Sequence, residues 1–215
     1  MKSTLSTSVN RFAIGLVALA AAGSVSATVL TSKIYVDNGF EAYISTSDTA
    51  AGTLFSSGHD WGTGFTDTTE LAAGTDYYLH VYGYDDNEVS YDAAAFLGQF
   101  SLSGTDHSFS NNLTTLLTDA THWTANTAGF DGPYTAVSSW GSNGDAPWGT
   151  REGVSNDAMW IWSADNVANN TAFFSTKISA AAAADVPEPT SIALVGLALA
   201  GLGLARARKA KASAA

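Results

Sequence analysis

The feature that most limits how this chain can fold is a series of short segments in which apolar and polar residues alternate. Turn-rich stretches such as Ser57–Asp60, Ala73–Asp76 and Ser103–Asp106 separate several of them. Alternation with a period of two is typical of half-buried strands, whereas a helix shows a period near 3.6. We therefore predict an all-β fold, an antiparallel β-sandwich or jelly roll, with one short helix at Asn112–Ala120. The predicted strands are Lys33–Val36, Phe40–Ser45, Leu54–Ser57, Tyr77–Gly83, Ala94–Ser103, Ala158–Ser163 and Ala172–Ser179.

Residues 1–27 have the pattern of a secretory signal peptide. Lys2 and Arg11 supply positive charge, the apolar run Phe12–Ala22 follows, and small residues lead up to a cleavage site after Ala27. An N-terminal membrane anchor is the alternative, but an apolar run of about 11 residues is too short to span a bilayer. We expect signal peptidase to remove this segment during export.

Residues 186–215 divide into three parts with different physical properties. The triplet Pro187-Glu188-Pro189 comes first, an apolar segment at 190–205 follows, and a basic tail occupies 206–211. Proline cannot donate to a helix or sheet, so the triplet should be exposed and extended. The run Ile192–Leu204 has 13 residues, which at about 1.5 Å per residue fall short of a hydrocarbon layer of about 30 Å. A permanent anchor would therefore be strained, and the basic tail should stay in the cytoplasm.

This order of parts closely resembles the PEP-CTERM sorting signal of Gram-negative bacteria. Val186–Ser191, the glycine-containing apolar segment and the basic tail carry the resemblance, with Ala207 separating Arg206 from Arg208 as a departure. The resemblance implies transient insertion into the inner membrane and processing by the membrane enzyme exosortase at Pro187, Glu188 and Pro189. It also implies a final location at the cell surface or in the extracellular matrix. A tail anchor and a buried core helix are the alternatives.

The region between the two ends is predicted to be one β-sandwich domain at residues 28–179, followed by an alanine-rich spacer at 180–185. Counted to residue 185, it contains 19 acidic and three basic residues, a net charge of −16 with histidine neutral. Nucleic acid is excluded as a partner, because such binding depends on basic residues that neutralise phosphates. The charge favours solubility and binding of polyvalent cations. Cysteine is absent, so no disulfide stabilises the domain.

Parts of this region also resemble galactose-binding-like jelly-roll domains. An aspartate precedes an aromatic-rich first strand, and short aromatic patterns follow in the same order as in that family. The residues that carry the likeness are Asp37–Ile44, His59-Asp60-Trp61, Phe65, Leu71–Gly74, Tyr77–Tyr82 and Ala158–Ser163. The insertion Thr121–Val154 departs from the pattern. The resemblance implies a jelly-roll architecture.

All six tryptophans lie in this region, and we expect them to serve two purposes. A tryptophan in a glycine-rich loop can stack on a sugar ring, and turn residues beside it can supply polar groups. Filling the core is the alternative for each of them. The predicted carbohydrate-binding residues are Trp140, Asn143, Asp145 and Trp148, whereas Trp61, Trp160 and Trp162 are expected in the core.

Acidic side chains follow the predicted strand Tyr77–Gly83 in close succession. Asp85, Asp86 and Glu88 offer several oxygen ligands, which suits Ca²⁺, and Asp37 and Asn38 could lie at the same edge. The spacing differs from that of an EF-hand loop. The sequence therefore predicts a candidate Ca²⁺ site, with a solvated acidic turn as the alternative.

Patterns typical of catalysis are missing from the sequence. It has no G-x-S-x-G, no H-E-x-x-H and no cysteine, and its four histidines are scattered. We therefore predict no catalytic residues. The predicted function is a non-catalytic surface or matrix protein that associates with exopolysaccharide, as the sorting-signal resemblance implies. The alternatives are a glycan-active enzyme and a Ca²⁺-dependent self-associating matrix protein.

Overall fold

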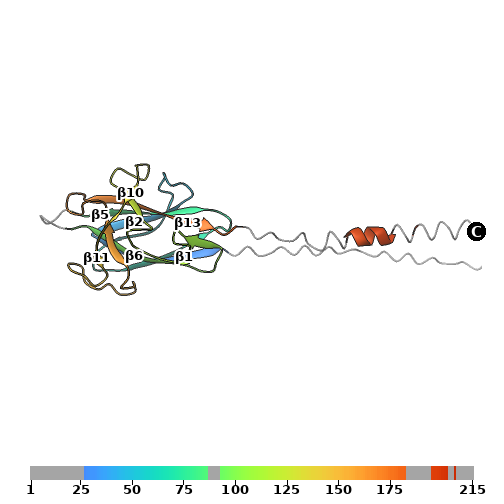
Figure 1. Ribbon diagram of the computed structural model, residues 1–215, viewed down its shortest axis with the longest axis horizontal. Helices are drawn as coiled ribbons and strands as arrows, with labels where there is room; N and C mark the ends of the chain where they lie inside the picture. Colours follow the sequence, from blue (N-terminus) through green and yellow to red (C-terminus); the bar gives the residue numbers. More distant parts are fainter. Residues whose placement is uncertain (1–26, 87–92, 183–194, 203–205, 207–215) are drawn as a thin grey trace, which may run out of the picture.

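The chain folds into a β-sandwich of two antiparallel sheets (Figure 1). The computed structural model describes residues 27–86, 93–182, 195–202 and 206. The predicted signal peptide up to residue 26, Glu88, the triplet Pro187-Glu188-Pro189 and the basic tail beyond Arg206 lie outside the described residues. The all-β sandwich predicted from the alternating segments is confirmed.

The first sheet, sheet A, has the strand order β11-β12-β6-β1-β4, with β8 paired to β6. The second, sheet B, has the order β10-β9-β13-β5-β2-β3, with β7 paired to β13. The strands of sheet A are β1 (Thr28–Asp37), β4 (Phe65–Leu71), β6 (Ala95–Leu102), β8 (Thr115–Leu117), β11 (Ser138–Ser142) and β12 (Met159–Trp162). Those of sheet B are β2 (Gly39–Ser45), β3 (Thr53–His59), β5 (Tyr77–Tyr84), β7 (His107–Phe109), β9 (Thr124–Asn126), β10 (Thr135–Ala136) and β13 (Thr171–Ala180).

The main hydrophobic core lies between the two sheets. Alternate residues of β1, such as Leu30, Ile34 and Val36, are buried there and meet residues such as Val81 and Phe174 from sheet B. The same alternation in the sequence predicted the strands, because residues two apart in a strand face the same side. All seven predicted strands correspond to observed ones, although β3 continues to His59, through most of the predicted turn Ser57–Asp60.

A second, smaller core covers part of the outer face of sheet A. It joins Tyr35 of β1 and Leu97 of β6 to Trp148, Val154 and Trp160. Tyr35 and Leu97 are the outward-facing partners of each other in the β1–β6 ladder. The second half of the insertion Thr121–Val154 therefore covers part of this outer face, together with the residues that follow it. The rest of the outer face is open.

The short helix predicted at Asn112–Ala120 is wrong. Asn112 has a φ of 61°, a left-handed conformation that ends regular structure and that asparagine tolerates. The Asn111 side chain accepts a hydrogen bond from the Leu113 amide and donates one to the Thr115 carbonyl. These bonds close a turn between β7 and β8, and the chain then continues as strand β8.

The chain enters and leaves the sandwich at the same end. His107 binds the Thr28 hydroxyl through Nδ1 at 2.9 Å, and it pairs with Ala180 in the β13–β7 ladder. Figure 1 shows the start of β1 and the end of β13 together at one end. Both cores lie within Leu30–Ile178, so this segment has what it needs to fold without either end.

Residues 195–202, in the predicted apolar segment, are helical. Val195, Leu197, Leu199 and Leu202 are all exposed, with at least half of their surface accessible. Within the parts of the chain that the structure describes, no helix has the length and apolar character needed to cross a membrane.

Candidate functional site

The two tryptophans predicted to bind sugar occupy different environments. Trp140 lies on the edge strand β11, and 38% of its surface is exposed. Trp148 is buried, stacks on Trp160 with ring centroids 4.9 Å apart, and donates from Nε1 to Asp37 Oδ2 at 2.9 Å. Of this pair, Trp140 therefore offers the accessible ring.

Asn143 and Asp145, the predicted polar partners, both bind the backbone of their own loop. The buried Asn143 amide donates to the carbonyls of Arg151 and Val154 at 3.0 and 2.9 Å and accepts from the Arg151 amide at 2.7 Å. Asp145 Oδ2 accepts from the Ser142 amide at 2.7 Å. Asp145 is exposed and could meet a ligand. Asn143 is buried, and its hydrogen bonds fix the backbone position of Arg151.

Trp61, which we expected in the core, is 46% exposed and contacts a cation instead. The Arg151 guanidinium carbon lies 4.7 Å from the Trp61 ring centroid, 5.7 Å from that of Tyr35 and 5.8 Å from that of Trp160. Lys33 Nζ lies 5.6 Å from the Tyr35 centroid. The sequence did offer a signal for this cluster: Lys33 and Arg151 are two of the three basic residues in a region with 19 acids.

Of the acidic residues proposed for Ca²⁺, the structure describes Asp85 and Asp86. Asp85 is buried, whereas Asp86 is exposed and its Oδ2 lies 2.6 Å from His59 Nε2. The Asp86 amide donates to Asn38 Oδ1 at 2.9 Å. Among the residues that the structure describes, no group of three acids or histidines could hold a metal ion. Glu88 lies outside those residues, so the Ca²⁺ site stays a prediction.

A buried histidine lies on the outer face of sheet B. His80 has no exposed surface, and its ring stacks on Phe130 with centroids 5.0 Å apart. Its Nε2 lies 3.7 Å from Asp48 Oδ1, which also accepts a 2.6 Å hydrogen bond from Ser175 Oγ. In a serine hydrolase the histidine lies between the serine and the acid. Here Asp48 lies between Ser175 and His80, so the group lacks the order that activates a nucleophile.

Two tyrosines on the same face have altered acidity. Burial, followed by a hydrogen bond to Glu41 and the charge of Glu41, raises the pKa of Tyr43 to about 12. Burial and the charge of Asp48 raise the pKa of Tyr134 to about 12. Both phenols stay protonated near neutral pH, so neither is a general base there.

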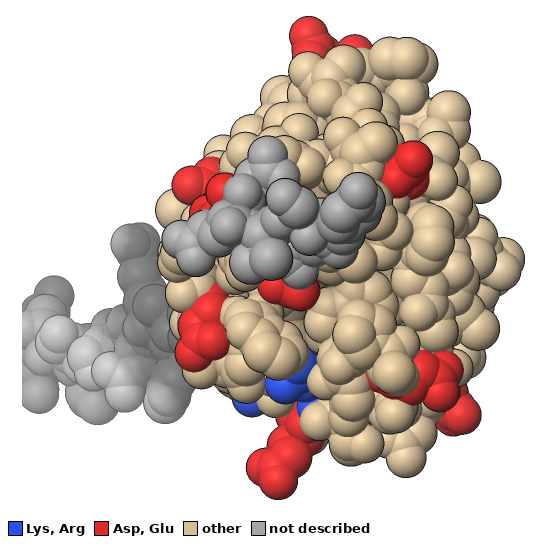
Figure 2. Space-filling view, turned by 90° about the vertical axis from the view of Figure 1, so that its left-hand side faces the viewer, with Lys and Arg blue, Asp and Glu red and all other residues tan. Residues whose placement is uncertain are grey.

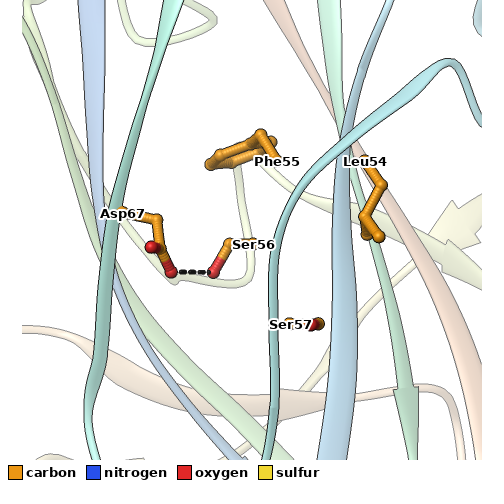
Figure 3. A pocket seen from close by; sticks show the side chains of 5 residues that line it. All are labelled: Leu54, Phe55, Ser56, Ser57 and Asp67. Carbon is orange, nitrogen blue, oxygen red and sulfur yellow. Dashed lines mark hydrogen bonds between the residues drawn. The ribbon is translucent and has the colours of Figure 1, made fainter.

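Two surface depressions in the described region bear on the question of a binding site. One of about 300 Å³ lies between the edge strands β3 and β4, where Ser56 Oγ donates to Asp67 Oδ2 at 2.7 Å (Figure 3). Figure 3 shows these two side chains facing each other across the gap. A second, of about 310 Å³, lies on the open part of the outer face of sheet A and includes Lys33. Neither contains a paired acid and base.

Comparison with known families identifies the end of the chain. A family profile described as the PEP-CTERM protein-sorting motif matches residues 185–209. The chain carries a PEP-CTERM sorting motif. The match includes the proline triplet, the apolar segment and most of the basic tail, so the recognition made from these parts is confirmed.

The PEP-CTERM motif establishes the route of the protein. It is exported and sorted by exosortase, and it associates with the cell surface. No curated protein and no solved structure matches the chain. The likeness to galactose-binding-like domains therefore has no support from these comparisons.

Proposed function

We propose that this PEP-CTERM protein is a non-catalytic surface or matrix component that binds exopolysaccharide. The sorting motif supports the first half of the proposal, because it directs the sandwich to the outside of the cell, where it can meet exopolysaccharide. The second half rests on the exposed tryptophans Trp61 and Trp140.

Exposed indoles stand out in this domain because its other tryptophans are buried. Trp123, Trp148, Trp160 and Trp162 have at most 6% of their surface exposed. A rigid, planar ring on a preformed sheet or tight loop can stack on a pyranose with little loss of conformational entropy. Trp140 on β11 and Trp61 in the β3–β4 loop both meet this condition.

A glycan-active enzyme is the competing proposal, and the chemistry of the described residues favours binding instead. Glycoside hydrolysis needs two carboxyl groups about 5–9.5 Å apart across a substrate cleft, one of them a proton donor with a raised pKa. The carboxyl groups with shifted acidity, Asp60, Asp76 and Asp165, have lowered pKa values and lie exposed on the surface. None of them is suited to donate a proton near neutral pH.

A glycan array with purified residues 28–185, run with and without Ca²⁺, tests the proposal. We expect binding of one or more polysaccharides and no release of reducing ends. Turnover of a bound glycan would replace the proposal with the enzyme, and calcium-driven assembly without glycan binding would replace it with a self-associating matrix protein. Trp140→Ala should weaken binding by about 1–3 kcal/mol if its ring stacks on sugar.

A further inference from the structure

We propose that Lys33, Trp61 and Arg151 form a subsite for an acidic sugar, a pyranose that carries a carboxylate. This inference rests on the proposed polysaccharide binding and names the class of sugar. The subsite lies where the cover of sheet A ends, between the β3–β4 loop and the segment that holds Arg151.

The backbone around the subsite is held rigidly. Asn143 binds both the amide and the carbonyl of Arg151, and the Tyr35 hydroxyl donates to the Glu152 carbonyl at 2.9 Å. Lys33 Nζ donates to the Gly64 carbonyl at 2.9 Å. A Cβ on Gly64 would lie 2.3 Å from the Tyr35 ring and 2.5 Å from the Lys33 stem, so only glycine allows this approach. The two cations are therefore positioned before any ligand arrives.

Two donors of the Arg151 side chain lack an acceptor among the residues that the structure describes. They are Nε and Nη2 of the guanidinium, both buried. Buried donors are nearly always satisfied in native proteins, and an unsatisfied one points to a missing partner. A carboxylate matches a guanidinium well, because two parallel hydrogen bonds can form between them.

The charges of the subsite are also unusual for this domain. Lys177, the third basic residue of the region, pairs with Asp76 at 2.7 Å, whereas neither Lys33 nor Arg151 forms an ion pair with a described carboxylate. The exposed Asp60 lies close enough to Arg151 to feel its charge. Hydrogen bonds from Thr63 and Gly62, and more weakly the charge of Arg151, lower its pKa. Figure 2 shows the basic atoms gathered in one place on this end of the sandwich, with acids spread around them.

The surroundings of the cations suit a sugar better than a small anion. Trp61 uses one face to contact Arg151 and still exposes almost half of its surface. Lys33 also borders the depression of about 310 Å³ on the outer face of sheet A, which is lined by Thr31, Thr66, Gln99 and Ser101. These hydroxyl and amide groups can bind the hydroxyls of neighbouring sugar units, so the subsite continues into a polar surface along the sheet.

Polygalacturonate and its methyl ester test the inference, because they share the sugar ring and differ in the carboxylate charge. The binding is measured by affinity electrophoresis of residues 28–185 at about 0.15 M salt. At this concentration, salt screens the interaction of the polysaccharide with acidic groups more than about 8 Å away. We expect the acid form to bind about tenfold or more tightly than the ester. Lys33→Met and Arg151→Gln should each weaken binding of the acid form about tenfold, and Lys177→Met, a matched control at the opposite end, should not.

The outcomes separate this inference from the proposed function. Equal binding of acid and ester, unchanged in the Lys33→Met protein, overturns the acidic-sugar subsite and leaves polysaccharide binding in place. Absence of binding to every polysaccharide tested overturns both. Binding of dextran sulfate as tightly as polygalacturonate overturns the assignment to a carboxylated sugar. If the Arg151→Gln protein fails to fold, the Lys33→Met protein provides the test. The methionine side chain can still pack on Tyr35, and the melting temperature of this variant can be compared with that of the unchanged protein.

Discussion

At the scale of residues, His80 is a titratable side chain that joins a strand to a loop. It lies on β5, is fully buried, and stacks on Phe130. Burial lowers the pKa of His80, and the charge of Asp48 acts in the opposite direction. The folded protein therefore keeps His80 neutral at a pH where the unfolded chain, with a histidine pKa near 6.5, already binds a proton. Protons then favour unfolding.

This sign gives a prediction about stability. The contribution of His80 is fully present above about pH 6.5 and is lost as the pH falls toward its lowered pKa. The loss is about 1.4 kcal/mol for each pH unit that separates the folded from the unfolded pKa. His80→Phe should remove this part of the pH dependence and keep the stacking on Phe130. Urea unfolding at pH 7.5 and pH 5 measures the difference. An equal loss of stability in both proteins between these pH values would show that His80 does not contribute.

At the scale of elements, the sequence predicts the strands in which apolar and polar residues alternate clearly. It misses strands that are mostly polar and form only because they pair with a strand distant in the sequence. β1, β2 and β5 alternate clearly because one face meets the main core. β4 was not predicted, because its sequence Phe65–Leu71 is mostly Thr, Asp and Glu and it pairs only at a sheet edge. The cover formed by Trp148 and Val154 could not be foreseen, since nothing local tells a sugar-binding loop from one that packs on a sheet.

The contrast between Trp148 and Trp140 provides a test of this cover. Trp148→Ala should destabilise the sandwich by about 3–5 kcal/mol, because it leaves a cavity beside Trp160 and removes the hydrogen bond to Asp37. Trp140→Ala on the exposed edge strand should change stability by about 0.5 kcal/mol or less. Chemical denaturation of both variants measures the difference. Similar losses would contradict the separate environments of the two rings.

At the scale of the whole molecule, the arrangement of the ends fits the route that the PEP-CTERM motif sets. Thr28 and Ala180 lie together at one end, joined through His107. The β3–β4 loop, with Trp61, lies toward the opposite end, where β2 pairs with the end of β3. The end of the sandwich with Trp61 is therefore opposite to the end at which β13 finishes. The proposed acidic-sugar subsite lies at the end away from the PEP-CTERM motif in the fold of the sandwich, so the start of the C-terminal segment does not cover it.

Processing at the triplet is the last prediction, and it concerns residues outside the described part of the chain. Pro187-Glu188-Pro189 lies within the matched motif, directly before the apolar segment. That segment is short for a permanent anchor, since about 20 apolar residues are needed to span a bilayer. Replacing the triplet with three alanines should leave full-length protein in the inner membrane of cells with an active exosortase. Fractionation and immunoblotting separate full-length from processed protein, and replacing the exposed Thr68 of β4 with alanine serves as a control. Normal release of the triple-alanine protein would mean that the triplet is not what exosortase requires, and the route would then depend on the apolar segment and the basic tail alone.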